Sequence, residues 1–337
     1  MSEALTNTMI AGEITRDYIV KSPTEVYMDI PGGPALYTAG GLMLWGENPG
    51  ILSMVSDDFP QDWIKDFSQL GLDVLGIQRQ EKPKNHLRFY GYLDENQIQT
   101  DNPITYFDQT NLPFPKELIG YQSQKVELDN RNATAPKFCR INDIPASYLN
   151  CPSIHLCAMD FLSSQILPDA MRQGNTTNIS LQASASYMDP LFLEMIPYLV
   201  NHLAVFHTSE ANLRALFQNR SKDLWEMAEA LGKFGCELLL IYRSNHTIFL
   251  YNGHSKEKWI IPAYPVEVTN IIGIEESFCG GFFANFRKTF DPVESALYGA
   301  ISASFTAQGF GPFFSLDAYP GLPEARLLSL REAVRKL

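Results

Sequence analysis

The stretch TNIIGIEESFCGGFFANF, residues 269–286, combines the end of an extended segment, a single glycine and a helix that we predict to open at Ser277. Junctions of a strand, a turn and a helix commonly bind an anion, because the first backbone N–H groups of the helix are unpaired and its N-terminus carries a partial positive charge. In this chain two carboxylates, Glu275 and Glu276, stand where a phosphate would lie. The stretch therefore predicts a βα unit, and it leaves open whether the anion site of this unit is intact, damaged or absent.

Similar units recur along the chain. Short apolar runs alternate with segments of helical periodicity, which is typical of a sheet whose strands are joined by crossover helices. The run at 50–55 is a predicted strand, and the helix after it begins at Pro60 and ends at Gly71. The other strands predicted to precede helices are 9–15, 153–159, 178–183 and 202–206. This alternation predicts an α/β fold with a central, mostly parallel sheet flanked by helices and a site at the carboxyl ends of its strands.

The other regular segments fit the same fold. They are helices over 34–46, from a cap at Ser221 through Leu231, and over 293–305 with a stop at Gly309, and two strands at 236–242 and 247–252 that pair across a polar turn.

Residues 92–138 break this regularity and are rich in Asn, Gln, Asp and Pro. A loop this long inside a compact domain is usually functional or disordered. We therefore predict a single domain over 1–337, with a loop-rich insertion or small lid at 92–138 that holds a short hairpin of its own.

The composition argues against several classes of protein. A chain of 337 residues with 45% hydrophobic content can bury a sizeable core. Its net charge of −12 argues against a nucleic-acid backbone or an anionic membrane as a partner. The first residues include no apolar signal region, and no stretch reaches about 18 apolar residues, so a cytoplasmic protein is expected. The five cysteines show neither a CxxC pair nor zinc spacing, which indicates neither disulfides nor a zinc site, and we expect most of them to be small buried side chains.

Five segments carry a resemblance to a known family. They are GEITRD (12–17), PGGPALYTAG (31–40), the Asp-Phe-Pro of SDDFP (56–60), HTSEANLRAL (207–216) and NIIGIEESFCGGFFA (270–284). In their order and spacing the chain resembles the ribokinase-like (PfkB) sugar and nucleoside kinases over nearly its whole length, and least so around 92–138. The last segment is the most specific, because SFCGG fixes its register against the family pattern Asp-Thr-Thr-Gly-Ala-Gly-Asp-Ser-Phe-x-Gly-Gly without a gap.

The resemblance implies a reaction and a phosphate-binding end. Family members transfer the γ-phosphoryl group of ATP to a sugar or nucleoside hydroxyl, with Mg²⁺ spreading the charge. On this pattern Glu276 takes the place of the catalytic base. Gly273 and Glu275 belong to the turn that binds phosphate and nucleotide, and Glu210 matches a glutamate that acts near the metal ion. ATP and Mg²⁺ are therefore the expected cofactors if the protein is active.

The resemblance also implies a substrate end. Asp17 matches the aspartate with which the family binds sugar hydroxyls, and it follows the first predicted strand. Gly32 and Gly33 match the glycine pair of the family's substrate site. The alternative for these residues is an exposed acid and an ordinary turn before a helix.

The departures from the family pattern cluster at the phosphate and nucleotide end. Glu275 replaces a glycine, and one negative charge about 4 Å from a phosphate costs on the order of 4 kcal/mol at an effective dielectric near 20. Glu276 is one methylene longer than the family's aspartate, and a displacement of about 1 Å can slow a reaction about 10²-fold. His207 stands at an asparagine position, and YRSNHT (242–247) lacks the glycine common near the nucleotide. At the substrate end, Tyr37 replaces an asparagine.

These departures predict a PfkB-type carbohydrate-kinase-like protein whose phosphotransfer is weak or lost. The alternative is a non-catalytic homologue that binds a sugar or nucleoside in a regulatory role, while a purely structural role rests only on the insertion. Glu275 and Glu276 have a simpler alternative, which is that they only stabilise the helix N-terminus. The expected ligand is a sugar or nucleoside, with no nucleic-acid or membrane partner, and the sequence is compatible with a homo-oligomer.

Overall fold

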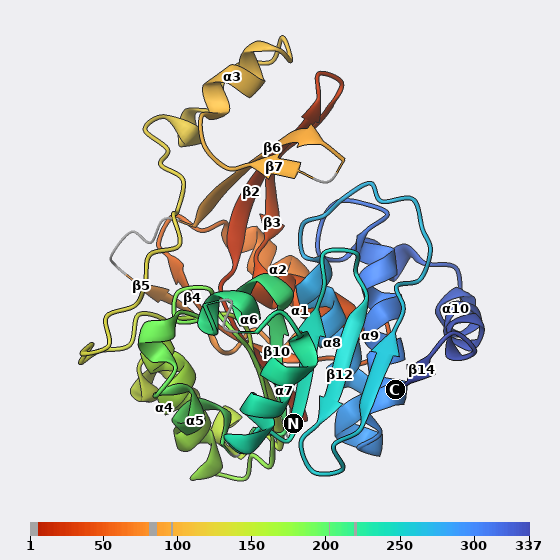
Figure 1. Cartoon of the computed structure of the whole chain (residues 1–337). Coiled ribbons are helices and arrows are strands. Elements are labelled where there is room, and N and C mark those ends of the chain that lie inside the picture. Colours follow the sequence, from red (N-terminus) through yellow and green to blue (C-terminus); the bar gives the residue numbers. More distant parts are fainter. Residues whose placement is uncertain (1–5, 81–85, 96, 202, 219–220) are drawn as a thin grey trace.

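The computed structural model describes residues 6–80, 86–95, 97–201, 203–218 and 221–337. Two sheets organise it: a large one within the main body and a smaller one that stands above it (Figure 1).

The large sheet has ten strands. They are β1 Thr8–Ala11, β4 Gly50–Ser56, β5 Ile77–Gln80, β8 Ser153–Leu156, β9 Asn178–Gln182, β10 Val205–Ser209, β11 Leu238–Tyr242, β12 Ile248–Asn252, β13 Lys258–Ile261 and β14 Arg335–Lys336. Their order is β14-β13-β12-β11-β10-β9-β8-β1-β4-β5. All neighbours from β5 to β11 are parallel, and those from β11 to β14 are antiparallel. The predicted α/β class with a mostly parallel central sheet is confirmed.

Helices cover both faces of the large sheet (Figure 1). One face carries α1 Pro34–Met43, α2 Gln61–Gln69, α8 Ile274–Thr289 and α9 Pro292–Thr306, and the other carries α4 Phe161–Arg172, α5 Ile196–Val200, α6 Glu210–Leu216 and α7 Leu224–Lys233. The helix α10 Leu322–Arg331 packs against α9. Side chains alternate across a strand, so Met9 of β1 joins one apolar cluster and Ile10 joins the cluster on the opposite face. Burial on both faces explains why the strands are apolar runs.

The smaller sheet, which we call the lid, has the order β3-β2-β6-β7. Its strands are β2 Thr15–Ser22, β3 Glu25–Gly32, β6 Leu87–Asp94 and β7 Gln97–Gln99, and α3 Pro103–Asp108 packs on its far side. Tyr18 and Val20 belong to the cluster beneath α3, whereas Ile19 packs with Tyr37 and Ile272 of the main body. Both faces of the lid thus pack apolar side chains, one face against α3 and the other against the main body.

Several predicted boundaries are wrong. The strand expected over 9–15 is β1, which ends at Ala11, and the β2–β3 hairpin of the lid was not predicted. Ser221 does not cap α7, because the Asp223 carboxylate accepts the Trp225 N–H at 2.8 Å from the position directly before the helix. Helix α10 was also missed.

Two other predicted segments lie differently from their expected ranges. Residues 92–138 begin inside β6 and contain β7, α3 and a long irregular segment. The strand expected over 202–206 begins outside the described residues, and the observed β10 runs Val205–Ser209.

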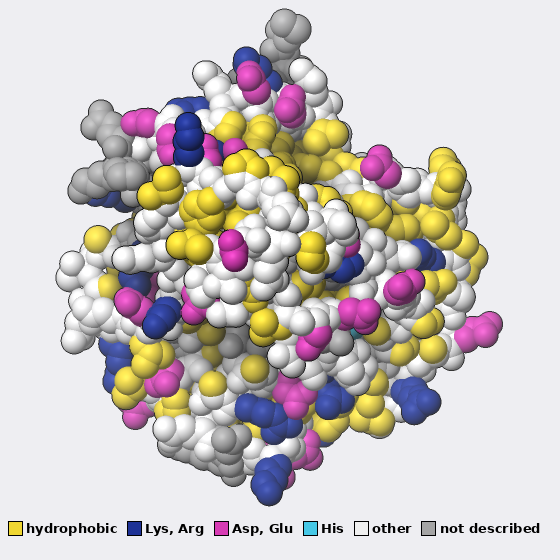
Figure 2. Space-filling view, turned by 90° about the horizontal axis from the view of Figure 1, so that it is seen from above, with side chains coloured by type: hydrophobic (Ala, Val, Ile, Leu, Met, Phe, Trp, Pro, Cys, Tyr) yellow, Lys and Arg dark blue, Asp and Glu magenta, His cyan; other side chains and the backbone are white. Residues whose placement is uncertain are grey.

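The surface shows charges of both signs. Seen from above the lid, Lys and Arg side chains are interspersed with Asp and Glu, and hydrophobic side chains gather in the upper middle of this face (Figure 2). Among the described helices, none has the length and hydropathy that crossing a membrane requires. All five cysteines are buried and free, as predicted.

Candidate active site

The opening stretch forms the N-terminus of α8. Its N-cap is Gly273, at a left-handed φ of 77°, and the helix begins at Ile274 rather than at the predicted Ser277. A Cβ at Gly273 would lie 2.1 Å from the Tyr37 ring, so both the conformation and the close approach require glycine. The earlier start places Glu275 and Glu276 in the first turn, where the helix dipole favours negative charge.

Glu276 faces a cavity between the lid and the main body. The cavity has a volume of about 210 Å³, and its lining includes Gly33, Tyr37, Tyr90 and Glu276. Gln182, at the end of β9, donates its Nε2 hydrogen to Glu276 Oε1 at 3.2 Å. Burial raises the pKa of Glu276, while the hydrogen bond from Gln182 opposes the rise. The structure thus places a fixed carboxyl group against a space for a ligand.

Asp17 lies inside β2 of the lid, not after the first strand of the main body. Its side chain is fully buried; Oδ1 accepts a hydrogen bond from the Thr15 hydroxyl at 2.6 Å, and Oδ2 has no partner among the described residues. Burial raises the pKa of Asp17 to about 7 against the opposing effects of Thr15 and Arg88. The charges of Asp17 and Glu276 both raise the pKa of Tyr90, after the larger effect of burial. Tyr90, which lines the cavity of Glu276, therefore senses the charges of both carboxyl groups.

The glycine pair joins the lid to α1. A Cβ at Gly32 would lie 1.9 Å from Asp17 Oδ2, so Gly32 leaves the space that this carboxyl group occupies. Gly33 is the N-cap of α1 at a φ of 95°, and a Cβ there would meet the Glu13 carbonyl at 2.6 Å. Both glycines are needed for close approach, and Gly33 also lines the cavity with Glu276.

Glu275 points to the other side of the helix N-terminus, into a small cavity. This cavity, about 20 Å³, lies at the carboxyl ends of β9 and β10 and includes Gln182, His207 and Glu275 in its lining. Burial, and secondarily the charge of Glu276, raise the pKa of Glu275 to about 8. Glu275 and Glu276 are therefore adjacent in sequence but face different spaces.

Glu210 is engaged by arginines. Its Oε1 accepts hydrogen bonds from Arg214 at 2.7 and 2.9 Å, and its Oε2 accepts one from Arg243 at 2.8 Å. The pKa of Glu210 is lowered because the two arginines outweigh the effect of burial. Both carboxylate oxygens are thus occupied, and no group of three His, Cys, Asp or Glu suited to a metal ion occurs among the described residues. As it stands, Glu210 does not fit the role of a metal ligand.

An apolar cavity that the sequence did not predict lies on the far side of α8. It has a volume of about 170 Å³ and is lined by Tyr242, Tyr264, Val268, Phe278 and Ala303, among others. Its wall comes from β11, α8, α9 and the segment between β13 and α8. The apolar residues Tyr264, Val266 and Val268 at every second position were a sequence signal, but only the fold brings them over α8.

A second missed feature is the cleft under residues 124–138, which we call the strap. The cleft has a volume of about 570 Å³, and Glu13, Arg88, Lys137, Asp160 and Ser184 belong to its lining. Arg88 of the cleft is two residues from Tyr90 of the Glu276 cavity on β6, and the Glu13 carbonyl lies beside Gly33, so residues of the two linings are neighbours.

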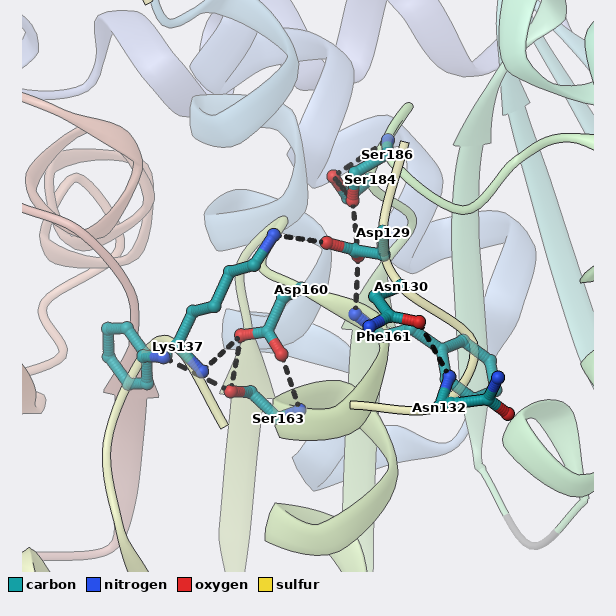
Figure 3. Close-up of polar contacts among 10 residues, drawn as sticks. Asp129, Asn130, Asn132, Lys137, Asp160, Phe161, Ser163, Ser184 and Ser186 are labelled. Atoms are coloured by element: carbon teal, nitrogen blue, oxygen red, sulfur yellow. Dashed lines mark hydrogen bonds and ion pairs between the residues drawn. The ribbon is translucent and has the colours of Figure 1, made fainter. Parts of the chain in front are cut away.

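Two aspartates hold the strap to the main body (Figure 3). The Asp129 carboxylate accepts hydrogen bonds from the Phe161 N–H and the Ser186 hydroxyl, both at 2.8 Å, and pairs with Lys137 at 2.7 Å. Asp160, the N-cap of α4, accepts the Lys137 N–H at 3.2 Å. The strap therefore closes one side of the cleft.

These features define a two-sheet α/β protein with a lid, whose carboxyl groups and glycine turns meet at the carboxyl ends of the parallel strands, as expected for a ligand site in this fold class. The chain matches the model of the pfkB family of carbohydrate kinases over residues 12–318. It belongs to that family.

Individual relatives are distant. A cytidine kinase from Thermococcus kodakarensis is 20% identical over 286 residues, which is 83% of this chain and 88% of that protein. An E. coli structure described as a ribokinase II in complex with ATP and Mg²⁺ has a TM-score of 0.69 at 16% identity, covering 96% of this chain and all of that one. The nucleoside kinase of Methanocaldococcus jannaschii has a TM-score of 0.63 at 16% identity, covering 96% of this chain and 97% of its own. The likeness extends over whole chains and shows the ribokinase-like fold.

Proposed function

We propose that this chain phosphorylates a hydroxyl group of a nucleoside or sugar with ATP–Mg²⁺, more slowly than an ordinary family member. Glu276 is the general base, and Asp17, Gly32 and Gly33 hold the acceptor. The observation that carries this proposal is the position of Glu276, which faces the cavity beside Gly33 while Gln182 fixes its carboxyl group.

The proton transfer follows from this position. The acceptor hydroxyl gives its proton to the Glu276 carboxylate as its oxygen bonds to the γ-phosphorus. The bond between the γ-phosphorus and the bridging oxygen breaks, and ADP leaves with that oxygen and its electron pair. The raised pKa means that Glu276, once ionised, is a stronger base than an exposed glutamate. This suits a general base, because catalytic groups act best with a pKa near the working pH. Its extra methylene and the Cβ of Glu275 at the helix N-terminus account for the slower rate.

The dimensions of the site support a nucleoside over a free monosaccharide. The 210 Å³ cavity and the 570 Å³ cleft under the strap have neighbouring residues in their linings, and pockets for small molecules usually measure about 300–1,000 Å³. Tyr37 and Tyr90 add aromatic surface near Glu276. The similarity to a cytidine kinase is in keeping with such an acceptor.

The apolar cavity beyond α8 is proposed to hold the adenine ring of ATP. Tyr242, Val268 and Phe278 offer a largely hydrophobic surface there, and the N-terminus of α8 separates this cavity from the acceptor side. A nucleotide bound in this way directs its phosphates toward the first turn of α8, where Gly273 and Glu275 lie. Mg²⁺ then enters with ATP as part of the substrate.

One observation favours a second function, a non-catalytic protein that binds the nucleoside or sugar. Arg214 and Arg243 occupy both oxygens of Glu210, which the family uses near the metal ion. If the arginines keep Glu210 when nucleotide binds, the acceptor site stays intact while the metal-linked part of the reaction is lost.

The test measures binding and ADP formation with a panel of nucleosides and sugars, using the natural protein, Glu276→Gln and the control Glu324→Gln. Glu324 is also in the first turn of a helix, but is exposed on α10. We expect Glu276→Gln to lower ADP formation at least 10²-fold with ATP affinity kept, because it removes a general base, and Glu324→Gln to behave like the natural protein. Acceptor binding without any ADP formation would favour the non-catalytic function instead.

A further inference from the structure

The small cavity beside Glu275 contains two polar atoms in need of partners. Gln182 and His207 are only 7% and 4% exposed, and both line this cavity. Gln182 Oε1 and His207 Nδ1 have no hydrogen-bond partner among the described residues. Buried polar atoms are almost always paired, and leaving one unpaired is costly. A group inside the cavity is therefore expected to satisfy both atoms, and Glu275 is the ionisable side chain placed there with them.

Gln182 needs a hydrogen-bond donor. Its Nε2 already donates to Glu276, so its Oε1 faces away from that carboxyl group and can only accept. A carboxylate has no hydrogen to give, whereas a protonated carboxyl group has one O–H. Of the two states of Glu275, only the neutral acid suits Gln182.

His207 needs the complementary partner. Ser180 Oγ lies 3.0 Å from His207 Nε2 and 3.0 Å from His155 Nδ1, so the three side chains form a chain across β10, β9 and β8. A hydroxyl group has one hydrogen, so it donates to one imidazole and accepts from the other. When His155 donates and His207 accepts, the remaining proton of His207 is on Nδ1 and points into the cavity. The carbonyl oxygen of a neutral Glu275 can accept it.

The lining of the cavity offers no positively charged side chain that would favour the ionised form of Glu275. The titratable groups that face it are Glu276 and Cys279 of α8, His207 of β10 and Tyr242 of β11, and the cavity lining includes no Lys or Arg. Burial lowers the pKa of His207 well below its ordinary value, so this ring is neutral at pH 7. Burial and the charge of Glu276 raise the pKa of Glu275 to about 8.

We propose that Glu275 is a neutral acid, held by Gln182 and His207, that turns its O–H toward a phosphate oxygen when ATP binds. The Glu275 O–H takes the place of the backbone N–H contacts with phosphate that a glycine at this position would allow. The neutral side chain donates a hydrogen bond to the phosphate instead of repelling it. This assignment rests on the proposed ATP-binding function. It makes Gln182 a residue that serves both glutamates, with its NH₂ group on Glu276 and its carbonyl oxygen on Glu275.

The first experiment is a calorimetric titration with ATP–Mg²⁺ between about pH 7 and about pH 9.5. A terminal phosphate has a second pKa of about 6, so ATP keeps nearly constant charge over this range. We expect a constant Kd up to about pH 8 and then a rise approaching tenfold per pH unit, because each deprotonated molecule loses the donor and gains a repelling charge.

The matched variant is Glu275→Gln, which keeps the size and a hydrogen-bond donor but cannot ionise. It should bind ATP within about threefold of the natural protein at pH 7 and show no weakening above pH 8. If Glu275 were a charged obstruction, Glu275→Gln would instead tighten binding at pH 7 by tenfold or more. That result would overturn the proposal.

A second experiment needs no nucleotide. Infrared difference spectroscopy of the natural protein against Glu275→Gln should show the carbonyl band of one protonated carboxyl group at pH 7, which disappears as the pH rises past about 8. Absence of this band with normal ATP binding would overturn the proposal and leave the kinase function standing. A band without ATP binding at any pH would overturn both the ATP-binding function and the role of Glu275 toward phosphate.

Discussion

At the scale of single residues, burial changes the meaning of the acids that the sequence singles out. Asp17, Glu275 and Glu276 all have a raised pKa, and burial is the largest cause in each case. A family pattern identifies such positions, but it does not say which protonation state they hold. That state depends on the surrounding groups, which come from distant parts of the chain.

Asp17→Asn tests the effect of burial on stability. The pKa of Asp17 rises from 3.8 to about 7 on folding, so the folded protein binds the extra proton and loses stability as the pH rises from about 4 to about 7. A shift of about 3 units corresponds to at most about 4 kcal/mol. Asp17→Asn keeps the oxygen that accepts from Thr15 but has no carboxyl group to deprotonate, so it does not lose stability in this way. The stability of the variant relative to the natural protein should therefore be greater at pH 8 than at pH 4.

Thermal unfolding at both pH values measures this difference, with Asp57→Asn as the control because Asp57 is exposed. Equal pH dependence in the natural protein and Asp17→Asn would contradict the raised pKa. The same variant should weaken nucleoside or sugar binding about 10- to 100-fold, the range expected for a lost hydrogen bond to a charged group. This also revises the idea of an exposed acid at position 17, since the side chain is buried.

At the scale of secondary-structure elements, the first turn of α8 depends on its contact with α1. Gly273 needs a left-handed backbone and also leaves room for the Tyr37 ring, whereas Gly46 has the same φ of 77° with no atom within 4 Å of its added Cβ. The two glycines therefore separate backbone strain from crowding.

Gly46→Ala should destabilise the protein by about 1–2 kcal/mol, the cost of a left-handed backbone for an L-residue. Gly273→Ala should cost about 1–3 kcal/mol more, because the added methyl group displaces the Tyr37 ring. Urea unfolding of both variants gives the comparison. Equal losses would show that the Tyr37 contact is unimportant for α8.

At the scale of the whole molecule, the strap joins the lid to the main body. It follows α3 of the lid and reaches β8 of the large sheet, and Asp129 is its most buried anchor, with a side chain that is 5% exposed. Removing this carboxylate leaves the Phe161 N–H without its partner and removes the bond from the Ser186 hydroxyl, while the backbone N–H of residue 129 still holds the strap to the Ser186 carbonyl, at 2.8 Å.

Asp129→Ala should therefore destabilise the protein by about 1–3 kcal/mol and expose the strap to trypsin, which can cut after Lys125, Arg131 and Lys137. Limited proteolysis followed by mass spectrometry measures both the rate and the sites of cleavage. Asp169→Ala is the control, because Asp169 is exposed and pairs with Arg172 of its own helix. Cleavage at unchanged rate in Asp129→Ala would show that other contacts hold the strap.

The sequence by itself determined the α/β class, the family and the positions of the candidate residues. Strands such as β4 and helices such as α9 follow from periodicity and end signals within a few residues, which are local properties of the chain. The register of SFCGG against the family pattern likewise predicted Glu276 at the base position without any structure.

Only the tertiary structure decided which strands form the lid, where the two unpredicted cavities lie and the state of each acid. The β2 strand pairs with β6 about 70 residues away in sequence, and Gln182 reaches Glu276 across 94 residues. Glu210 pairs with Arg243, which lies in the turn between β11 and β12 rather than on its own helix. Burial and pairing of charges depend on such long-range neighbours, and no periodicity along the chain encodes them.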